Sequence, residues 1–535
     1  MTAGNITMKR TPKAGTFRLF TNARIHSLGD KRTEEALACH VFTGAILAVG
    51  KSKELLGRYK SLKPEIIDLQ GMTVLSGFTD CHTHFCGYSL MLSRPNLDSV
   101  RSLKDCLKIV SGYLKGKRPG QWLLGTGWNK NIWAEGRLPR KKDLDAISPS
   151  NPVFLWGKDW HTAWINSAAI KELGLDSEIP GLPGGLVERD RDGRPSGIVR
   201  EEAANQCYLR IPKPSEKEQR EALDLGQKVF AQMGLTGFHT METGAEFSLL
   251  QKAHQEGQLH LRAVAYLRED SLTEAVGLGL RSGFGDDFLK FGGLKLFIDG
   301  SLGSQTALML KPYSSGNSFG LQVADYDQLL SLAKTAAQHG IACAIHAIGD
   351  AANKMALDIY RQTRNLDRTL RHRIEHCQSV AASDLIRYRE LGVIASVQPI
   401  HLPSDIDLIK KYWVGREASA YPFGSLAKAG TTIVFGSDAP IETPDPFKAI
   451  QAAVTRQRGD NPESFYPKER MNIKQAVRAY TSDAAYASGR EKVLGTLEPG
   501  KLADFICLSD DLFQVRADEI GRLKVKRTFI GGREI

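Results

Sequence analysis

The alternation of short apolar runs with longer amphipathic stretches most constrains how this chain folds. Between about residues 72 and 492, apolar runs that end in polar residues are separated by helical patterns such as 327–339 and 352–360. Strand–helix alternation of this kind is typical of a parallel α/β architecture, and eight repeats predict a TIM-type (β/α)8 barrel. The eight predicted strands are 74–78, 235–238, 261–266, 293–298, 341–345, 373–375, 393–397 and 432–436.

The two ends of the chain have a different pattern. Short strand-like segments with polar turns lie in 17–71 and again in 493–535, which predicts that both termini join in one small β-domain. Residues 1–16 are polar and basic and are interpreted as a flexible tail. The stretch from about 94 to 215 is too long for one helix, so we interpret it as an insertion over the mouth of the barrel, where long loops are usually functional.

Composition limits the partners and the compartment. The net charge of +11 is spread along the chain, and its densest cluster, 137–142, lacks interleaved aromatic residues, so no nucleic-acid partner is expected. No run of 18 apolar residues occurs, so no membrane partner is expected. The eight cysteines lie mostly in apolar runs, which is typical of reduced thiols in a cytoplasmic protein.

Side chains that can bind metal follow the apolar runs. In a parallel barrel the carboxyl ends of the strands face a common mouth, so these residues are expected to converge. His82 and His84 are two residues apart and would share one face of a strand, although such a pair alone is a weak signal. His and Asp are common Zn²⁺ ligands. The converging set is His82, His84, Lys295, His346, His376 and Asp438.

Lys295 requires a separate explanation because it lies in an apolar strand. Burial of an unpaired ammonium group costs free energy. Three interpretations stay open: Lys295 pairs with Asp299, it extends to the rim of the barrel, or it loses its proton and adds CO₂. The carbamate formed in the third case is an anionic oxygen donor that can bridge two cations.

The same segments resemble a known family. From about residue 18 to the end, the chain is similar to the amidohydrolase superfamily and specifically to its amidohydrolase-3 (YtcJ-like) branch. The motifs occur in the family's order, each on the expected strand. They are Gly-Phe-Thr-Asp-Cys-His-Thr-His at 77–84, the glycine-rich segment 293–307, Ile-His-Ala-Ile-Gly-Asp at 345–350, Arg-Ile-Glu-His-Cys-Gln at 373–378, Phe-Gly-Ser-Asp-Ala-Pro at 435–440 and the tail 495–504.

The resemblance implies a distorted (β/α)8 barrel with a small β-sandwich domain formed by both termini. It implies one or two divalent metal ions, with Zn²⁺ expected first, and a homodimer by family habit. His82 and His84 would hold one metal and His346 and His376 the second. A carboxylated Lys295 would bridge them, and Asp438 would complete the first metal's ligands.

The predicted reaction is hydrolysis by a metal-activated hydroxide. Asp438 would orient the hydroxide, accept its proton and deliver it to the leaving nitrogen. The predicted substrate is a small molecule with a non-peptide C–N bond, such as an N-substituted amide, a formamide or a carbamoyl group. The alternatives are a cyclic amidase, a deaminase or an esterase on the same centre, and a non-catalytic regulatory or scaffold protein.

Further residues near the predicted site have a structural or a functional interpretation, and some keep both. His161, in the insertion, has a counterpart in the family and would contact the substrate carbonyl or leaving group, or it would cap the next helix. His239 is interpreted as buried and structural, and His401 as a substrate contact at the mouth. Four tryptophans of the insertion would line a substrate pocket or form the insertion's own core: Trp128, Trp133, Trp160 and Trp164.

Overall fold

The computed structural model describes residues 16–27, 33–159, 161–175, 185–459 and 461–535. The predicted tail therefore lies outside the described residues, apart from residue 16. The chain divides into two compact units, one made of Met1–Phe85 with Gln227–Ile535 and the other of Cys86–Gly226. The first unit holds the barrel and a β-sandwich, and the second has a sheet of its own.

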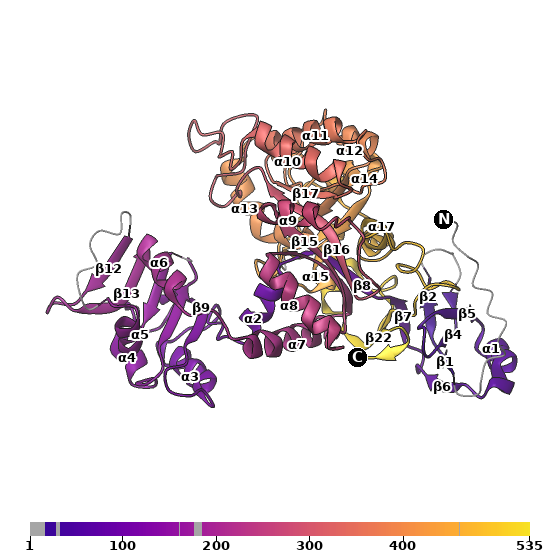
Figure 1. The fold of residues 1–535 in the computed structure, drawn as a ribbon, viewed down its shortest axis with the longest axis horizontal. Helices are drawn as coiled ribbons and strands as arrows, with labels where there is room; N and C mark the ends of the chain where they lie inside the picture. The colour runs from indigo at the N-terminus through magenta and orange to yellow at the C-terminus, as the bar shows by residue number, and fades with distance from the viewer. Residues whose placement is uncertain (1–15, 28–32, 160, 176–184, 460) are drawn as a thin grey trace. The chain divides into compact units, whose positions relative to one another are not determined.

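The barrel is a sheet of eight parallel strands (Figure 1). Consecutive strands pair in parallel from β8 through β14 to β20, and a parallel bridge between Thr83 and Ala439 joins the last strand region to the first. This confirms the predicted (β/α)8 fold. The strands are β8 (Phe78–Thr83), β14 (Leu235–Glu242), β15 (Arg262–Arg268), β16 (Leu289–Phe297), β17 (Cys343–Ala347), β18 (Arg373–His376), β19 (Ile394–Val397) and β20 (Ile433–Phe435).

The first predicted strand, 74–78, was placed wrongly. Residues Thr73–Ser76 form β7, which pairs with β2 (Arg24–His26) and β21 (Phe505–Leu508) outside the barrel. The chain passes from one sheet to the other at Gly77, where a Cβ atom would lie 2.3 Å from the Thr236 side chain. Because only glycine fits this close approach, the apolar run continues through a change of sheet.

Helices follow most barrel strands, as the amphipathic stretches predict. The predicted helix 327–339 is α10 (Tyr326–Gln338), which begins where the Asp325 carboxylate accepts hydrogen bonds from the backbone N–H groups of Asp327 and Gln328. The other helices of the first unit include α8 (Gly244–Gln255), α9 (Leu272–Gly277), α11 (Asp350–Thr363), α12 (Leu385–Leu391), α13 (Leu402–Tyr412), α14 (Phe423–Lys428), α15 (Pro446–Thr455), α16 (Ile473–Tyr480) and α17 (Ser482–Ala487), and α7 (Glu216–Gln232) spans the boundary between the two units.

Both ends of the chain contribute to two further sheets. One has the order β5-β4-β1-β6 and the other the order β23-β22-β21-β7-β2-β3. A shared apolar core that includes Phe20, Phe505 and Phe529 holds the two terminal regions together. The strands not yet bounded are β1 (Phe17–Thr21), β3 (Thr33–Glu34), β4 (Ala36–His40), β5 (Ile46–Gly50), β6 (Glu65–Asp68), β22 (Val525–Ile530) and β23 (Arg533–Glu534), with helix α1 (Ser52–Tyr59) beside them.

The second unit contains the predicted insertion. Its sheet has the order β12-β13-β11-β10-β9. Trp128, Trp133 and Trp164 pack in one apolar core of this unit, whereas Trp160 lies outside the described residues. The elements are α2 (Phe85–Leu92) at the junction, α3 (Leu103–Leu114), β9 (Leu123–Trp128), α4 (Lys141–Asp145), β10 (Val153–Gly157), β11 (Thr162–Ile165), α5 (Ser167–Glu172), β12 (Gly185–Arg189), β13 (Pro195–Glu201) and α6 (Glu202–Arg210).

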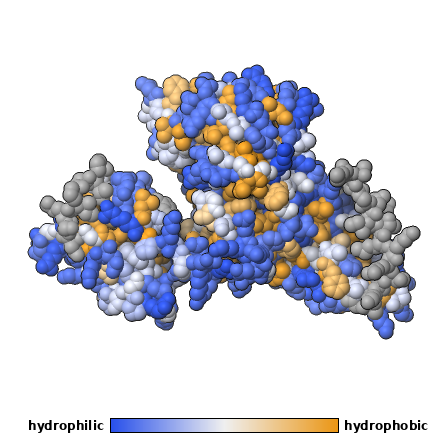
Figure 2. Space-filling view, in the orientation of Figure 1, coloured by the Kyte–Doolittle hydropathy of each residue, from blue (hydrophilic) through white to orange (hydrophobic). Residues whose placement is uncertain are grey.

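The face of the molecule in view is mostly hydrophilic (Figure 2), and the cysteines are buried. Hydrophilic residues cover most of the face in view in Figure 2. Among the described residues, no helix combines the length and apolar character needed to cross a bilayer. All eight cysteines are buried as free thiols.

Candidate metal centre

Three of the predicted ligands meet at the carboxyl ends of the barrel strands. His82 lies in β8, His376 is the last residue of β18, and Asp438 follows β20. One ligand atom from each lies within 4.8 Å of the others, and all three residues are buried. The strands bring together residues that are hundreds of positions apart, which is the arrangement expected at the mouth of a barrel.

The barrel closes at this cluster. A Cβ atom on Gly436 would lie 2.4 Å from the backbone nitrogen of His82, so only glycine allows the two segments to approach. The backbone N–H groups of Ser437 and Asp438 donate to the His82 carbonyl at 3.2 and 2.7 Å. His376 and Asp438 adopt positive φ angles of 76° and 59°. Such conformations persist in non-glycine residues only where the surrounding structure enforces them, as at functional sites.

Hydrogen bonds fix the orientation of the first two histidine rings. His82 Nδ1 lies 2.5 Å from Glu375 Oε2. Although burial alone would raise it, the pKa of Glu375 lies well below its usual value because Arg373 and His82 adjoin the carboxylate. Glu375 is therefore an acceptor, and His82 Nδ1 donates to it. His84 Nδ1 likewise donates to the Met241 carbonyl at 3.1 Å. In a neutral imidazole this leaves the lone pair on Nε2 of each ring.

Both lone pairs face one carboxylate oxygen. The Nε2 atoms of His82 and His84 each lie 3.4 Å from Asp438 Oδ1. His82 and Asp438 are buried, and the His84 side chain is 40% exposed. Acceptors that face one another in this way are stabilised by a cation between them. His82 Nε2 and His376 Nδ1 also have no hydrogen-bond partner within the described chain, so the site fits a divalent metal ion.

His346 lies beside this cluster. Its ring centroid is 4.4 Å from that of His376, and its Nε2 lies 3.1 Å from the Gly300 carbonyl. Burial, reinforced by Lys295, lowers the pKa of His346 to about 3, and burial holds the pKa of His376 well below its usual value. Both rings are therefore neutral near pH 7, the form that binds metal. With His346 Nε2 donating to Gly300, its Nδ1 is left to accept a cation.

Lys295 is almost completely buried, at 1% exposure. Its Nζ lies 4.9 Å from the centre of the Phe297 ring, and no hydrogen bond or ion pair to another described residue is formed. Burial lowers the pKa of Lys295 to about 8, although Glu375 and Asp438 raise it. The alternative in which Lys295 pairs with Asp299 is wrong. Asp299 instead accepts backbone hydrogen bonds of 2.8–3.0 Å from Leu308, Ile348 and Gly349.

The sequence interpretation missed the network behind His82. Arg373 donates to Glu375 through Nε at 2.5 Å, and its Nη1 lies 3.0 Å from His239 Nδ1. Asp80 accepts from the backbone of His82 at 3.0 Å and from the Ser437 hydroxyl at 2.5 Å. These residues fix the ligands rather than bind metal. The available signal was the presence of several charged residues within apolar strand sequences, since such groups are buried only when paired.

Three other predicted residues, His161, His401 and His239, are not among the residues grouped at the cluster. His161 belongs to the second unit, where its Nδ1 lies 3.0 Å from Glu201 Oε2 and its side chain is 68% exposed. Its contact with substrate stays a prediction. His401 is buried, with its ring stacked 6.4 Å from that of His376. His239 is buried, with its Nδ1 3.0 Å from Arg373 Nη1, and burial keeps its pKa well below the usual value.

A parallel eight-stranded barrel with buried histidines and a carboxylate at the carboxyl ends of its strands defines a metal-dependent hydrolase. Residues 65–535 match the Amidohydrolase family Amidohydro_3. Because this match covers most of the chain, the protein belongs to that family. It is a metal-dependent amidohydrolase, a hydrolase acting on C–N bonds.

Individual proteins show the same similarity. The chain is 33% identical to "Protein LONG AFTER FAR-RED 3" of Arabidopsis thaliana, over 98% of this chain and 93% of that protein. It is 30% identical to "Putative amidohydrolase YtcJ" of Bacillus subtilis, over 94% and 96%. An "uncharacterized metal-dependent hydrolase" of Pyrococcus furiosus has a similar solved structure, with a TM-score of 0.79 and 29% identity, over 93% of this chain and 100% of that one.

Proposed function

We propose that the protein hydrolyses a non-peptide C–N bond in a small molecule, of the N-substituted amide, formamide or carbamoyl type. The two imidazole lone pairs aimed at Asp438 Oδ1 carry this proposal, because they create a site for a catalytic cation. The similarity to the "N-substituted formamide deformylase" of Arthrobacter pascens, 28% identical over 96% of this chain and 97% of that protein, supports the formamide class first. The free, buried cysteines support a cytoplasmic location.

The residues of the site would divide the work of binding. His82, His84 and Asp438 would hold one ion, and His346 and His376 a second. Zn²⁺ is the metal we propose, because imidazole and carboxylate are its usual ligands at catalytic sites. When bound, such an ion supplies a Lewis acid and lowers the pKa of water toward neutrality.

Asp438 would move the proton. Its Oδ1 faces the centre of the cluster, where it would accept a proton from the attacking water. The same carboxyl group would then deliver that proton to the leaving nitrogen, because an amine leaves far more readily when protonated. The Glu375 carboxylate would keep the His82 ring in one tautomer throughout, by accepting its Nδ1–H.

Lys295 would act as a carbamate. This proposal is supported by a buried side chain that forms no hydrogen bond or ion pair with another described residue, on a strand that ends beside the histidines. The product would be an anionic ligand between the two metal positions. His161 of the second unit would contact the substrate carbonyl or the leaving group.

Metal analysis and a substrate screen test the proposal together. The protein is purified without chelator, its Zn content is measured by plasma mass spectrometry, and the N-formyl, N-acetyl and N-carbamoyl derivatives of one primary amine are compared. We expect one or two ions per chain and turnover of the formyl derivative first. A metal-loaded protein that hydrolyses none of the three would contradict the proposal and favour the scaffold alternative.

The variant Asp438→Asn sharpens this test. It keeps the size of the side chain and removes the proton acceptor, so kcat is expected to fall by roughly 10²–10⁴-fold. Asp511→Asn is the matched control, because Asp511 is a buried aspartate that binds Arg24 and His26 of the β-sandwich. Equal losses of kcat in the two variants would contradict the role of Asp438 as proton acceptor.

A further inference from the structure

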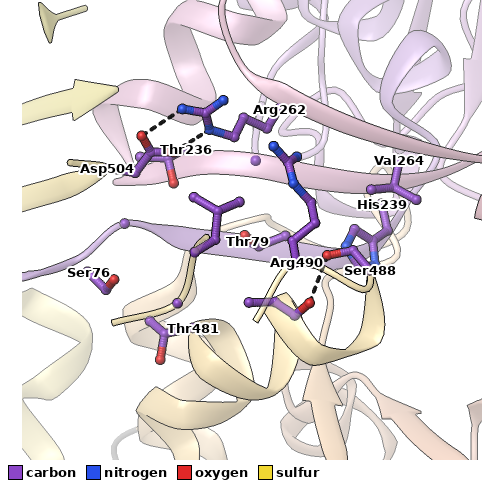
Figure 3. Close-up of a pocket in the computed structure, with 15 residues that line it drawn as sticks. Ser76, Thr79, Thr236, His239, Arg262, Val264, Thr481, Ser488, Arg490 and Asp504 are labelled. Carbon is purple, nitrogen blue, oxygen red and sulfur yellow. Dashed lines mark hydrogen bonds and ion pairs between the residues drawn. The ribbon is translucent and has the colours of Figure 1, made fainter. Parts of the chain in front are cut away.

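A polar cavity lies at the end of the barrel opposite the metal centre, among the amino-terminal ends of the strands. Figure 3 shows the residues that line it. The cavity has a volume of about 20 Å³ and is lined by the amino-terminal parts of β8, β14 and β15 and by the segment that follows α17. This volume holds about one water molecule or one ion of similar size. Its polar lining is Ser76, Thr79, Thr236, His239, Arg262, Thr481, Ser488, Arg490 and Asp504.

Arg490 brings an incompletely bonded cation to this cavity. The residue is 3% exposed, and its Nε has no hydrogen-bond partner within the described chain. Its Nη2 donates to the Asp287 carbonyl at 2.5 Å and lies 3.3 Å from Asp287 Oδ1. The Asp287 side chain is 61% exposed, so water screens its charge. Figure 3 shows the Arg490 side chain extending into the pocket toward Arg262.

The other charges around the cavity do not neutralise Arg490. The only buried carboxylate in its lining is Asp504, and Arg262 occupies it through Nε and through Nη2 at 2.9 Å. Asp504 Oδ1 also accepts from the backbone N–H of Gly531 at 2.8 Å. His239 is neutral, because burial keeps its pKa well below the usual value. The lining therefore holds two guanidinium groups and one buried carboxylate.

We infer that this cavity binds a small inorganic monovalent anion of the size of chloride, held by the free N–H of Arg490 and the hydroxyl of Thr79. A buried cation whose ion-pair partner is exposed to water is incompletely neutralised, and an anion beside it lowers the cost of its burial. The unpartnered atom is a donor, which an anion accepts. The hydroxyl of Thr79 makes no hydrogen bond to another described residue and supplies a second donor at the wall.

Anomalous diffraction locates the ion directly in the intact protein. Crystals of the metal-loaded wild-type chain are soaked in bromide, which replaces chloride and scatters anomalously. We expect a bromide peak within hydrogen-bonding distance of Arg490 Nε. Soaked crystals that show only water in the cavity would overturn the inference.

Thermal unfolding tests whether the ion binds in solution. Chloride is exchanged for gluconate, which is too large for the cavity, at constant ionic strength. The wild-type Tm is expected to be a few degrees higher in chloride, because a ligand that binds only the folded state stabilises it. Arg490→Met should abolish this difference, and Thr79→Val, which keeps the side-chain shape, should reduce it.

The remaining outcomes are also decisive. A bromide peak without any chloride-dependent shift in the wild-type Tm would mean an adventitious ion only and would overturn the inference. A shift that persists unchanged in Arg490→Met would place the anion elsewhere and overturn it too. If Arg490→Met does not fold, Thr79→Val and the wild-type diffraction decide the matter, with loss of the shift and a peak in the cavity supporting the site.

Discussion

The two ends of the barrel expose opposite kinds of unsatisfied atom. At the carboxyl ends of the strands, the unpartnered atoms include His376 Nδ1 and His82 Nε2, and the latter lies 3.4 Å from an oxygen of the Asp438 carboxylate. At the amino ends, an unpartnered atom is the Nε–H of Arg490, beside a second arginine. A cation would therefore satisfy the unpartnered acceptors at the carboxyl ends, and an anion would satisfy the unpartnered donor at the amino ends. The comparison teaches that the charge of a missing ligand can be inferred from the polarity of the groups left without partners.

The network of Arg373 lies between the two ends. Arg373 binds Glu375 on the metal side and His239 on the side of the anion cavity. If the two ends have separate roles, substitutions at the carboxyl ends should change activity and metal binding, and substitutions at the amino ends should change stability. Four variants test this division.

The largest effect is expected for Lys295→Ala. Loss of the proposed bridging ligand should reduce kcat/KM by roughly a thousandfold or more while the circular dichroism spectrum is unchanged. Lys290→Ala is the matched control, because Lys290 lies in the same strand at its amino end and donates to the Gly283 carbonyl. Retained turnover in Lys295→Ala would defeat the bridging role.

The next largest effect is expected at the opposite end. Asp504→Asn leaves the buried guanidinium of Arg262 without its counter-charge, and breaking a buried pair costs about 3–5 kcal/mol of unfolding free energy. Denaturant unfolding measures this loss. The activity of the folded fraction should equal that of the wild type, and a large fall in kcat without loss of stability would break the division between the two ends.

Glu375→Gln should weaken metal binding by about 10–100-fold, because the His82 Nδ1–H then donates to a neutral amide rather than a carboxylate. Competition with a chelator measures the affinity. Since the neutral amide of this variant cannot neutralise Arg373 either, Arg373→Met in the same background separates the two causes. Restored affinity in the double variant would assign the loss to the uncompensated arginine rather than to His82.

The smallest expected effect concerns pH. Burial lowers the pKa of His372 to about 4, so this residue stays neutral in the folded chain while the unfolded chain binds a proton below about 6.5. Stability from this residue is present above pH 6.5 and is lost as pH falls toward 4, by about 2 kcal/mol at pH 5. His372→Asn, whose amide oxygen can replace Nδ1 as acceptor for the Cys343 N–H, should flatten this dependence. An unchanged slope would exclude His372 as its source.

The barrel was predictable from sequence because buried parallel strands appear as continuous apolar runs that alternate with amphipathic helices. The convergence of His82, His376 and Asp438 followed from their positions at strand ends, without any distance information. The residues that fix them were not predictable in the same way. The contact of Glu375 with His82 joins positions 293 residues apart, and nothing in either local sequence specifies that pairing.

Two failures have specific physical causes. Residues 74–78 form one continuous apolar run because the strand residues in both sheets are apolar. Only the close packing around Gly77 shows where the chain passes from one sheet to the other. Asp299 is four positions after Lys295 in the sequence, which made an ion pair between them plausible. In the structure the Asp299 carboxylate instead accepts hydrogen bonds from backbone N–H groups of later loops. The spacing of residues in the sequence does not show which donor, a lysine or a backbone N–H group, the carboxylate will bind.

The β-sandwich has a consequence for biosynthesis. Its β7 pairs with β21, so Ser76 meets Phe505 only after the 428 positions between them have been translated. At the usual rate of elongation this takes roughly 20–90 s, during which the first strands present open edges at the ribosome. A truncated chain that ends before residue 505 would keep those edges exposed permanently, and we expect it to be captured by chaperones or to aggregate even where its barrel has formed.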